Sequence, residues 1–222
     1  MAKTVIHDEQ GNASWGGEDH LQAAQSRSFA SLIFELLSEK IPTPEELKIF
    51  ELVLNLSIDH GPETPSAQKV ISEKGKGKSI TEAVAAGILE INDAHGGAGE
   101  PLMELLYEVK SKKGKGKSLV EEHLKKGKRL PGFGHRLYKD DDPRVLLIFK
   151  KARELNIGLE YIEMIENIQG ELEKQKGLRL PVNIDGAIAV ILCAFGWPAK
   201  MGKIVFIIAR TPGLCGQYLN AK

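Results

Sequence analysis

Apolar residues recur along most of this chain at the three-to-four-residue spacing that one face of an α-helix requires. The stretches with this spacing cover residues 19–39, 43–54, 79–93, 101–109, 143–155 and 158–176. The second of them has a clear start: Thr43 can cap the helix, and Pro44 suits its first turn. Residues 1–17 are polar, contain several glycines and have no helical period. The pattern therefore predicts a series of helices joined by short connections.

Two later segments are more uniformly apolar. The segment NIDGAIAVILCAFG, residues 183–196, is apolar nearly all round, which indicates a buried helix. The segment GKIVFIIART, residues 202–211, contains a β-branched run that suits a strand equally well. Because no partner strand is evident elsewhere, we expect a helix here too. The predicted fold class is all-α.

Composition and charge exclude several classes of partner. The 222 residues include 30 basic and 30 acidic side chains, so no overall basic field attracts nucleic acid or a membrane surface. The apolar runs are too short to span a bilayer, and the start, MAKTVIHDEQ, lacks the apolar core of a signal peptide. Two cysteines, Cys193 and Cys215, make no disulfide framework. We expect a soluble cytoplasmic protein that binds neither nucleic acid nor membranes.

The sequence KGKGKS occurs twice, at residues 74–79 and 113–118. Each copy ends in a Ser-x-x-Glu capping box, which starts a helix. The boxes pair Ser79 with Glu82 and Ser118 with Glu121. A phosphate-binding P-loop needs a glycine where these copies have Ser72 and Ser111, and neither copy follows an apolar strand. We interpret both copies as basic connections between helices.

The stretch LPGFGHRLYKDDDPR, residues 130–144, combines features of an anion-binding site. Gly132 and Gly134 permit a tight turn, and the histidine that follows, His135, titrates near neutral pH. Asp142 can cap a helix that begins at Pro143. Three cations surround the acidic run, namely Arg136, Lys139 and Arg144. The alternative is a charged surface turn with an incidental histidine.

Three further residues are candidates for chemistry. His95 precedes two glycines, where a ligand can approach the backbone, although a helix-terminal histidine that interacts with Asp93 or the helix dipole is the alternative. Asp185 opens an apolar helix; it is either a helix-start carboxylate or an acid whose pKa is raised for proton transfer. His60 in DHG is either functional or a buried histidine with satisfied hydrogen bonds.

Other kinds of site are not indicated. The histidines show no paired ligand spacing, and the cysteines lie too far apart in sequence for a zinc knuckle. The sequence also contains no Gly-x-Ser-x-Gly elbow of a serine hydrolase. We expect neither a metal nor a resident cofactor.

Four motifs, in order, resemble the citrate synthase family. GFGHRLYKDDDPR is similar to its Gly-x-Gly-His turn followed by Asp-Pro-Arg, and the other matching segments are residues 58–67 (IDHGPETPSA), 94–100 (AHGGAGE) and 180–188 (LPVNIDGAI). Within that family, the motifs are most similar to those of citryl-CoA lyases and of the lyase module of ATP-citrate lyase. The resemblance implies one citrate synthase-like domain over residues 1–222, with a reduced large domain and a small domain near residues 95–190 that carries most catalytic motifs.

The resemblance also implies an activity: cleavage of citryl-CoA to acetyl-CoA and oxaloacetate. Alternatives are citrate or 2-methylcitrate synthesis, and a non-catalytic CoA-binding subunit that assembles with a citryl-CoA-forming ligase. The coenzyme A thioester is then the substrate or product, with no metal. A weaker alternative for the basic KGKGKS loops is that either of them helps to hold the phosphates of coenzyme A.

Residue roles follow from the same resemblance. The position of His95 stabilises the enolate of acetyl-CoA, that of His135 contacts the keto oxygen and receives the hydroxyl proton in cleavage, and that of Asp185 exchanges the methyl proton. The residues implied to bind the four-carbon acid are His60, Arg144 and Arg210. The positions implied to meet coenzyme A are Gly132, Phe133, Gly134, Arg136 and Lys139.

Two departures from the family bear on activity. Family members continue beyond the position of Lys222 and deliver another substrate arginine across a dimer interface, and SWGGEDH replaces an Arg-Gly-Tyr type of segment. One carboxylate contact is therefore missing from the expected set. We still expect a homodimer, and the small-residue helix around residues 83–89 is suited to packing against a symmetry mate.

Overall fold

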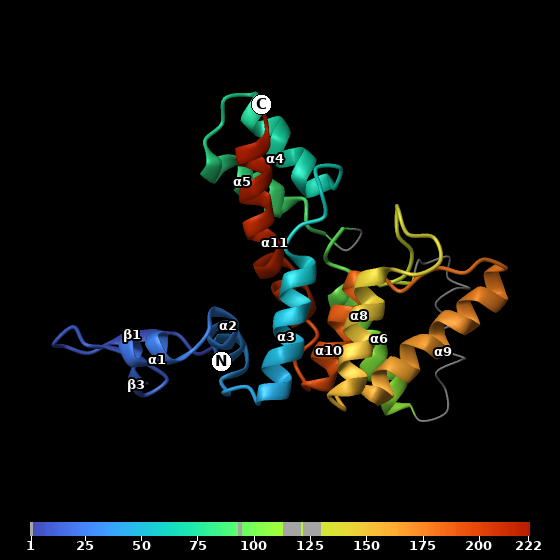
Figure 1. Cartoon of the computed structure of the whole chain (residues 1–222), viewed down its shortest axis with the longest axis horizontal. Helices are drawn as coiled ribbons and strands as arrows, with labels where there is room; N and C mark the ends of the chain where they lie inside the picture. Colours follow the sequence, from blue (N-terminus) through green and yellow to red (C-terminus); the bar gives the residue numbers. More distant parts are fainter. Residues whose placement is uncertain (1, 93–94, 113–120, 122–129) are drawn as a thin grey trace. The chain divides into compact units, whose positions relative to one another are not determined.

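The structure, a computed structural model, describes residues 2–92, 95–112, 121 and 130–222. The chain forms two compact units, Met1–Leu52 and Val53–Lys222, and α3 (Pro44–Ser57) begins in the first and ends in the second (Figure 1). Within the described residues the regular structure is helical apart from a three-stranded sheet near the N-terminus. The predicted helical fold class is confirmed.

The sheet of the first unit was not predicted. Its strands are β1 (Val5–His7), β2 (Ala13–Trp15) and β3 (Glu18–Asp19), antiparallel in the order β1-β2-β3. Val5 lies opposite Trp15, and Ser14 lies opposite Asp19. Strands of two or three residues are too short to show the alternation of apolar and polar side chains that identifies a strand.

The predicted helix over residues 19–39 is two helices, α1 (His20–Ser26) and α2 (Phe29–Ser38). The break comes at Ser28, whose hydroxyl accepts a hydrogen bond from the Ser31 N–H and caps α2. The first N–H groups of a helix have no carbonyl partner within that helix, and the Ser28 hydroxyl supplies an acceptor for the N–H of Ser31. A new helix can therefore begin here.

The predicted apolar stripe along residues 19–39 was only partly correct, because Ile33 is buried but Leu21 and Phe29 are exposed. Phe34, which was not in that stripe, is buried and packs edge-on against Phe50 of α3, with ring centroids 5.4 Å apart.

A buried carboxylate joins the sheet to α2. Glu35 is fully buried, and its side chain accepts from Lys3 Nζ at 2.9 Å and from Trp15 Nε1 at 3.2 Å. Arg27 Nε lies 3.2 Å from the same carboxylate. These partners offset the cost of removing the charge from water.

The second unit contains the other helices. They are α4 (Pro65–Gly75), α5 (Ile80–Leu89), α6 (Gly99–Ser111), α8 (Pro143–Glu154), α9 (Leu159–Lys176), α10 (Ile184–Ala194) and α11 (Met201–Asn220). The helix α4 was not predicted, and α11 extends well beyond its predicted segment; the other bounds lie within a few residues of those predicted. As predicted, α10 is buried nearly throughout; it contacts α6, α8, α9 and α11 (Figure 1). The ambiguous residues 202–211 lie in α11 and are helical, as predicted.

The small-residue helix α5 packs inside its own chain. Its predicted capping box between Ser79 and Glu82 is present; Ser118 of the second box lies outside the described residues. A Cβ atom added at Gly87 would lie 2.5 Å from Val70 Cγ2 of α4. Ala83 and Gly87 are therefore covered by α4 and α11 of the same chain, whereas Leu89 is exposed. The expectation that this helix packs against a symmetry mate stays a prediction.

No helix in the described part of the chain has both the length and the apolar character needed to cross a membrane. No group of three or more metal-binding side chains occurs among those residues. Cys193 is buried and Cys215 half-buried, and both are free thiols. The small domain expected near residues 95–190 stays a prediction.

Candidate active site

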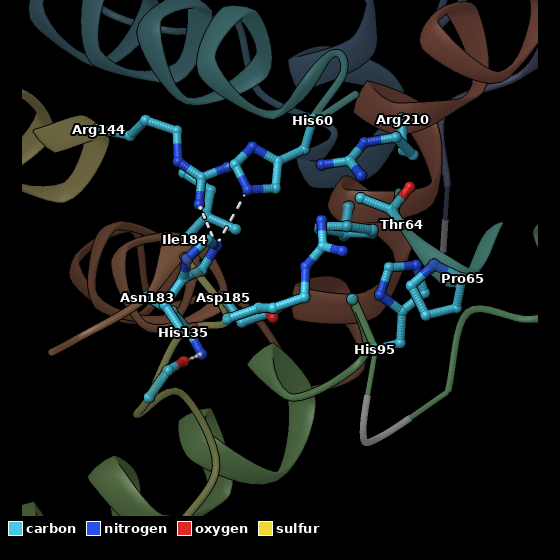
Figure 2. A pocket seen from close by; sticks show the side chains of 14 residues that line it. His60, Thr64, Pro65, His95, His135, Arg144, Asn183, Ile184, Asp185 and Arg210 are labelled. Carbon is cyan, nitrogen blue, oxygen red and sulfur yellow. Dashed lines mark hydrogen bonds between the residues drawn. The ribbon is translucent and has the colours of Figure 1, made fainter. Parts of the chain in front are cut away.

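The predicted catalytic and acid-binding residues line one cavity of about 280 Å³ in the second unit (Figure 2). They are His60, His95, His135, Arg144, Asp185 and Arg210. The two loops that follow α3 and α5, the turn before α8, and the helices α8, α10 and α11 supply them. Segments far apart in the sequence thus converge on one space.

Arg144 is held by its own helix cap. Asp142 is 1% exposed and caps α8 by accepting from the Arg144 N–H at 3.0 Å, as predicted. The same carboxylate accepts from the guanidinium, with Nε–Oδ1 at 3.0 Å and NH2–Oδ2 at 2.6 Å. Two-point pairing fixes the plane of the guanidinium. Its NH1 then lies 3.3 Å from His60 Nδ1 and its NH2 3.4 Å from His135 Nε2.

The backbone selects the tautomer of His135. Its Nδ1 accepts from the N–H groups of Leu137, at 3.1 Å, and Tyr138, at 3.0 Å. A neutral ring then carries its proton on Nε2, which points toward Arg144 and His60. The Tyr138 ring stacks on the imidazole, with centroids 4.6 Å apart and planes 19° apart. His135 therefore presents an oriented N–H donor.

His60 completes a site with more donors than acceptors. Its Nε2 lies 3.0 Å from His135 Nε2, while its Nδ1 faces Arg144. Burial and then the charge of Arg144 lower the pKa of His60 to about 4, so the ring is neutral at pH 7 and has one proton for two nitrogens. Either tautomer of His60 leaves a donor of its ring facing another donor, in addition to the pair formed by Arg144 NH2 and the protonated Nε2 of His135. An oxygen-rich anion between them would relieve this conflict.

His95 is oriented by the start of α4. Its Nε2 lies 2.9 Å from Ser66 Oγ and accepts from the Ser66 N–H at 3.4 Å, which leaves the proton of the neutral ring on Nδ1. Burial, then Arg210, lowers the pKa of His95. The next residue, Gly96, has a φ of +73° and packs on Phe206. The alternative partner Asp93 lies outside the described residues.

Asp185 is a buried carboxylate in the first turn of α10. It is 8% exposed, and its Oδ1 has no hydrogen-bond partner among the described residues. Burial raises the pKa of Asp185 to about 6, against the opposing charges of Arg210 and Arg144. A carboxyl group with such a pKa can both give and take a proton near neutral pH.

Arg210 is almost fully buried beside this carboxylate. It is 2% exposed, its Nε donates to the Ser57 carbonyl at 2.8 Å, and its guanidinium carbon lies 4.7 Å from the centre of the Phe206 ring. Burial lowers the pKa of Arg210 to about 10, which keeps it charged at neutral pH. With neutral histidines, the positive charge of the cavity comes from arginine.

A larger cavity of about 1040 Å³ adjoins the first. Five residues line both cavities, namely Gly134, His135, Arg136, Asn183 and Asp185. Gly132 and Phe133 also line the larger one, so four of the five positions expected to meet coenzyme A lie on its wall. Lys139 is not among the lining residues, and its Nζ donates to the Arg136 carbonyl at 2.9 Å.

Sequence reasoning missed several residues of the smaller cavity. Thr64, Ser66, Asn183 and Phe206 were not singled out, although each lines this cavity or orients a residue that does. Asn183 had a detectable signal, because an asparagine directly before an apolar helix is a favoured cap. Phe206 had none, since one apolar residue in an apolar helix cannot be told from its neighbours.

Comparison with known proteins identifies the family. The model "Citrate synthase, C-terminal domain" matches residues 4–222. The structure of citryl-CoA lyase from Hydrogenobacter thermophilus superposes with a TM-score of 0.90 and 36% identity, covering 100% of this chain and 86% of that one. The ATP citrate lyase of Methanosaeta concilii, solved with (3S)-citryl-CoA, shares the fold at a TM-score of 0.86 and 21% identity, over 99% of this chain and 38% of that one.

Curated sequences agree. The citrate/2-methylcitrate synthase of Bacillus subtilis (strain 168) is 33% identical over 203 residues, which is 88% of this chain and 53% of that protein. The chain spans about half or less of the length of the first curated relatives it matches. The family model covers almost every residue, and a relative about as long has nearly the same fold. The chain therefore belongs to the citrate synthase family.

Proposed function

We propose that this chain cleaves citryl-CoA to acetyl-CoA and oxaloacetate. One observation carries the proposal: a small cavity with arginine and histidine donors shares its buried carboxylate, Asp185, with a larger cavity. The donors suit a carboxylated acid, and the larger cavity has room for a thioester chain. Asp185 stands where the two parts of such a substrate would join.

The proposed cleavage uses only groups of these cavities. The hydroxyl proton of citryl-CoA passes to the unprotonated ring nitrogen of His60, because His135 already carries its proton on Nε2 and accepts from the backbone at Nδ1. The carbon–carbon bond then breaks to give a keto group and a thioester enolate. His95, with its proton on Nδ1, stabilises the enolate oxygen. Asp185 gives its proton to the enolate carbon, and both groups regain their starting protonation through solvent.

The neighbours support the substrate but not one direction. The lyase of Hydrogenobacter thermophilus supports cleavage, whereas the Bacillus subtilis relative is named for synthesis of citrate or 2-methylcitrate. Condensation is therefore the second candidate function. Microscopic reversibility assigns the same residues to both directions.

Release of oxaloacetate from citryl-CoA tests the proposal. We expect turnover by the purified chain, and at least 10²-fold less by the Asp185→Asn variant, which keeps the size of the side chain but cannot transfer the proton. Absence of oxaloacetate above the uncatalysed rate at high enzyme concentration would refute cleavage. Release of free thiol from acetyl-CoA or propionyl-CoA with oxaloacetate measures condensation.

Titration calorimetry with coenzyme A separates catalysis from a binding role. Binding without turnover in either direction would favour a non-catalytic subunit that acts with a citryl-CoA-forming ligase. Turnover by the isolated chain would exclude that alternative. The expected compartment is the cytoplasm.

A further inference from the structure

Asn183 connects the two segments that carry His135 and Asp185. Its side-chain Oδ1 accepts from the Gly186 N–H at 3.2 Å and caps α10, the helix of Asp185. Its Nδ2 donates to the Gly134 carbonyl at 3.0 Å, directly before His135 (Figure 2). One amide thus bonds to both segments at once, and the residue lines both cavities.

Backbone contacts bring the same two segments together. The Asn183 N–H donates to the Gly132 carbonyl at 3.0 Å, and the Gly134 N–H donates to the Pro181 carbonyl at 2.7 Å. A Cβ atom added at Gly186 would lie 2.8 Å from the Gly132 carbonyl oxygen. The glycine turn therefore rests directly on the first turn of α10. The direction of this turn decides where the His135 ring points.

We propose that Asn183 is a positioning residue that holds the His135 turn at a set distance from Asp185. This role rests on the proposed function, because it matters to a reaction that uses both groups. An amide is suited to it, since it accepts and donates at the same time. Serine could keep the helix cap but has no second arm to reach Gly134, and aspartate could cap but has no proton for that carbonyl.

Two variants isolate the bond to Gly134. Asn183→Ser and Asn183→Asp each retain an acceptor for the cap of α10 and lose the amide N–H that reaches the Gly134 carbonyl. We expect each to lower kcat about 10²-fold, as a small misplacement of reacting groups does, with a smaller change in the KM for citryl-CoA. Ser79→Ala is the matched control, because it removes a helix cap outside both cavities. It should lower the melting temperature and leave kcat unchanged.

Hydrogen exchange provides a readout that does not depend on activity. In both Asn183 variants, exchange should speed up in residues 130–136, which are joined to α10 through the lost bond; Ser79→Ala should not change that segment. A folded Asn183→Ser variant with wild-type kcat, or with unchanged exchange in residues 130–136, would overturn the positioning role. If Asn183→Ser does not fold, the same criteria apply to Asn183→Asp. A wild-type chain without turnover refutes the proposed function instead, while the exchange measurement still tests the link.

Discussion

At the scale of single residues, burial determines which groups of the cavity are charged and which are neutral. It lowers the pKa values of His60, His95 and His135, so these rings are neutral donors and acceptors near pH 7. The lasting positive charge belongs to Arg144 and Arg210. The cavity can therefore hold an anion over a wide pH range, while in the proposed reaction the titration of Asp185 sets the rate of proton transfer.

Asp185→Asn should lower kcat by about 10²- to 10⁴-fold, the usual contribution of a general acid or base. In the wild type, cleavage needs the protonated acid, so kcat/KM should fall as the pH rises through about 6; condensation needs the carboxylate and should rise over the same range. Rates from pH 5 to 8 in both directions measure this. A variant with wild-type turnover would end the catalytic assignment.

The same carboxyl group should make stability depend on pH. Its pKa is raised from 3.8 to about 6 by folding, so its contribution is complete below pH 4 and is lost as the pH rises through 6. Two pKa units correspond to about 3 kcal/mol of unfolding free energy. Asp185→Asn should thus gain stability over wild type between pH 4 and pH 7 in denaturant titrations. The exposed Asp140→Asn control should not, and an equal response of both variants would contradict the assignment.

Arg144→Lys should mainly weaken binding of the four-carbon acid. Lysine keeps the charge but cannot maintain the two-point contact with Asp142 while presenting a planar edge to the cavity. We expect the KM for oxaloacetate in the condensation assay to rise at least about 10-fold, in line with the 1.5–3 kcal/mol of a charged hydrogen bond. Lys150→Arg, on the exposed part of α8, is the control and should leave that KM unchanged.

At the scale of elements, glycine turns allow loops to approach helices closely. Gly96 and Gly77 both have positive φ angles, +73° and +78°. A Cβ atom at Gly96 would lie 2.1 Å from the Phe206 ring of α11, whereas one at Gly77 would have no atom within 4 Å. The two positions share the backbone cost of an added side chain and differ in packing.

Gly96→Ala should therefore reduce both stability and activity, because either the Phe206 ring or the His95 loop must move. Gly77→Ala should cost only the backbone strain, roughly 1–2 kcal/mol, and leave kcat unchanged. Melting temperature and kcat measured on both variants compare the two effects. Equal losses at both positions would show that the contact with Phe206 has no role in placing His95.

At the scale of the whole molecule, assembly remains a prediction. The resemblance implies a homodimer, but the small-residue face of α5 is occupied by α4 and α11. Ala83 and Gly87, which are buried there, are therefore not available to a symmetry mate. Light scattering at micromolar concentration should give twice the chain mass of 24.3 kDa. A monomeric mass would overturn the prediction.

The sequence by itself determined much of this protein. Helical spacing located α3, α5, α6, α8 and α9 but not α4, and the local signals at Ser79 and Asp142 identified two helix starts. Helical spacing and helix-cap signals each involve residues only a few positions apart, so they can be recognised from the sequence alone. The break at Ser28 and the two- to three-residue strands were missed, because their signals are shorter than the period used to find them.

Only the tertiary structure decided how the candidate residues act. His60, His95, His135 and Asp185 lie in separate segments, and the packing around α10 brings them to one cavity. The pKa of Asp185 follows from burial, and the proton of His135 is placed by two backbone N–H groups. Desolvation and hydrogen-bond direction depend on which atoms surround a group in space, and residues far apart in the chain supply those atoms.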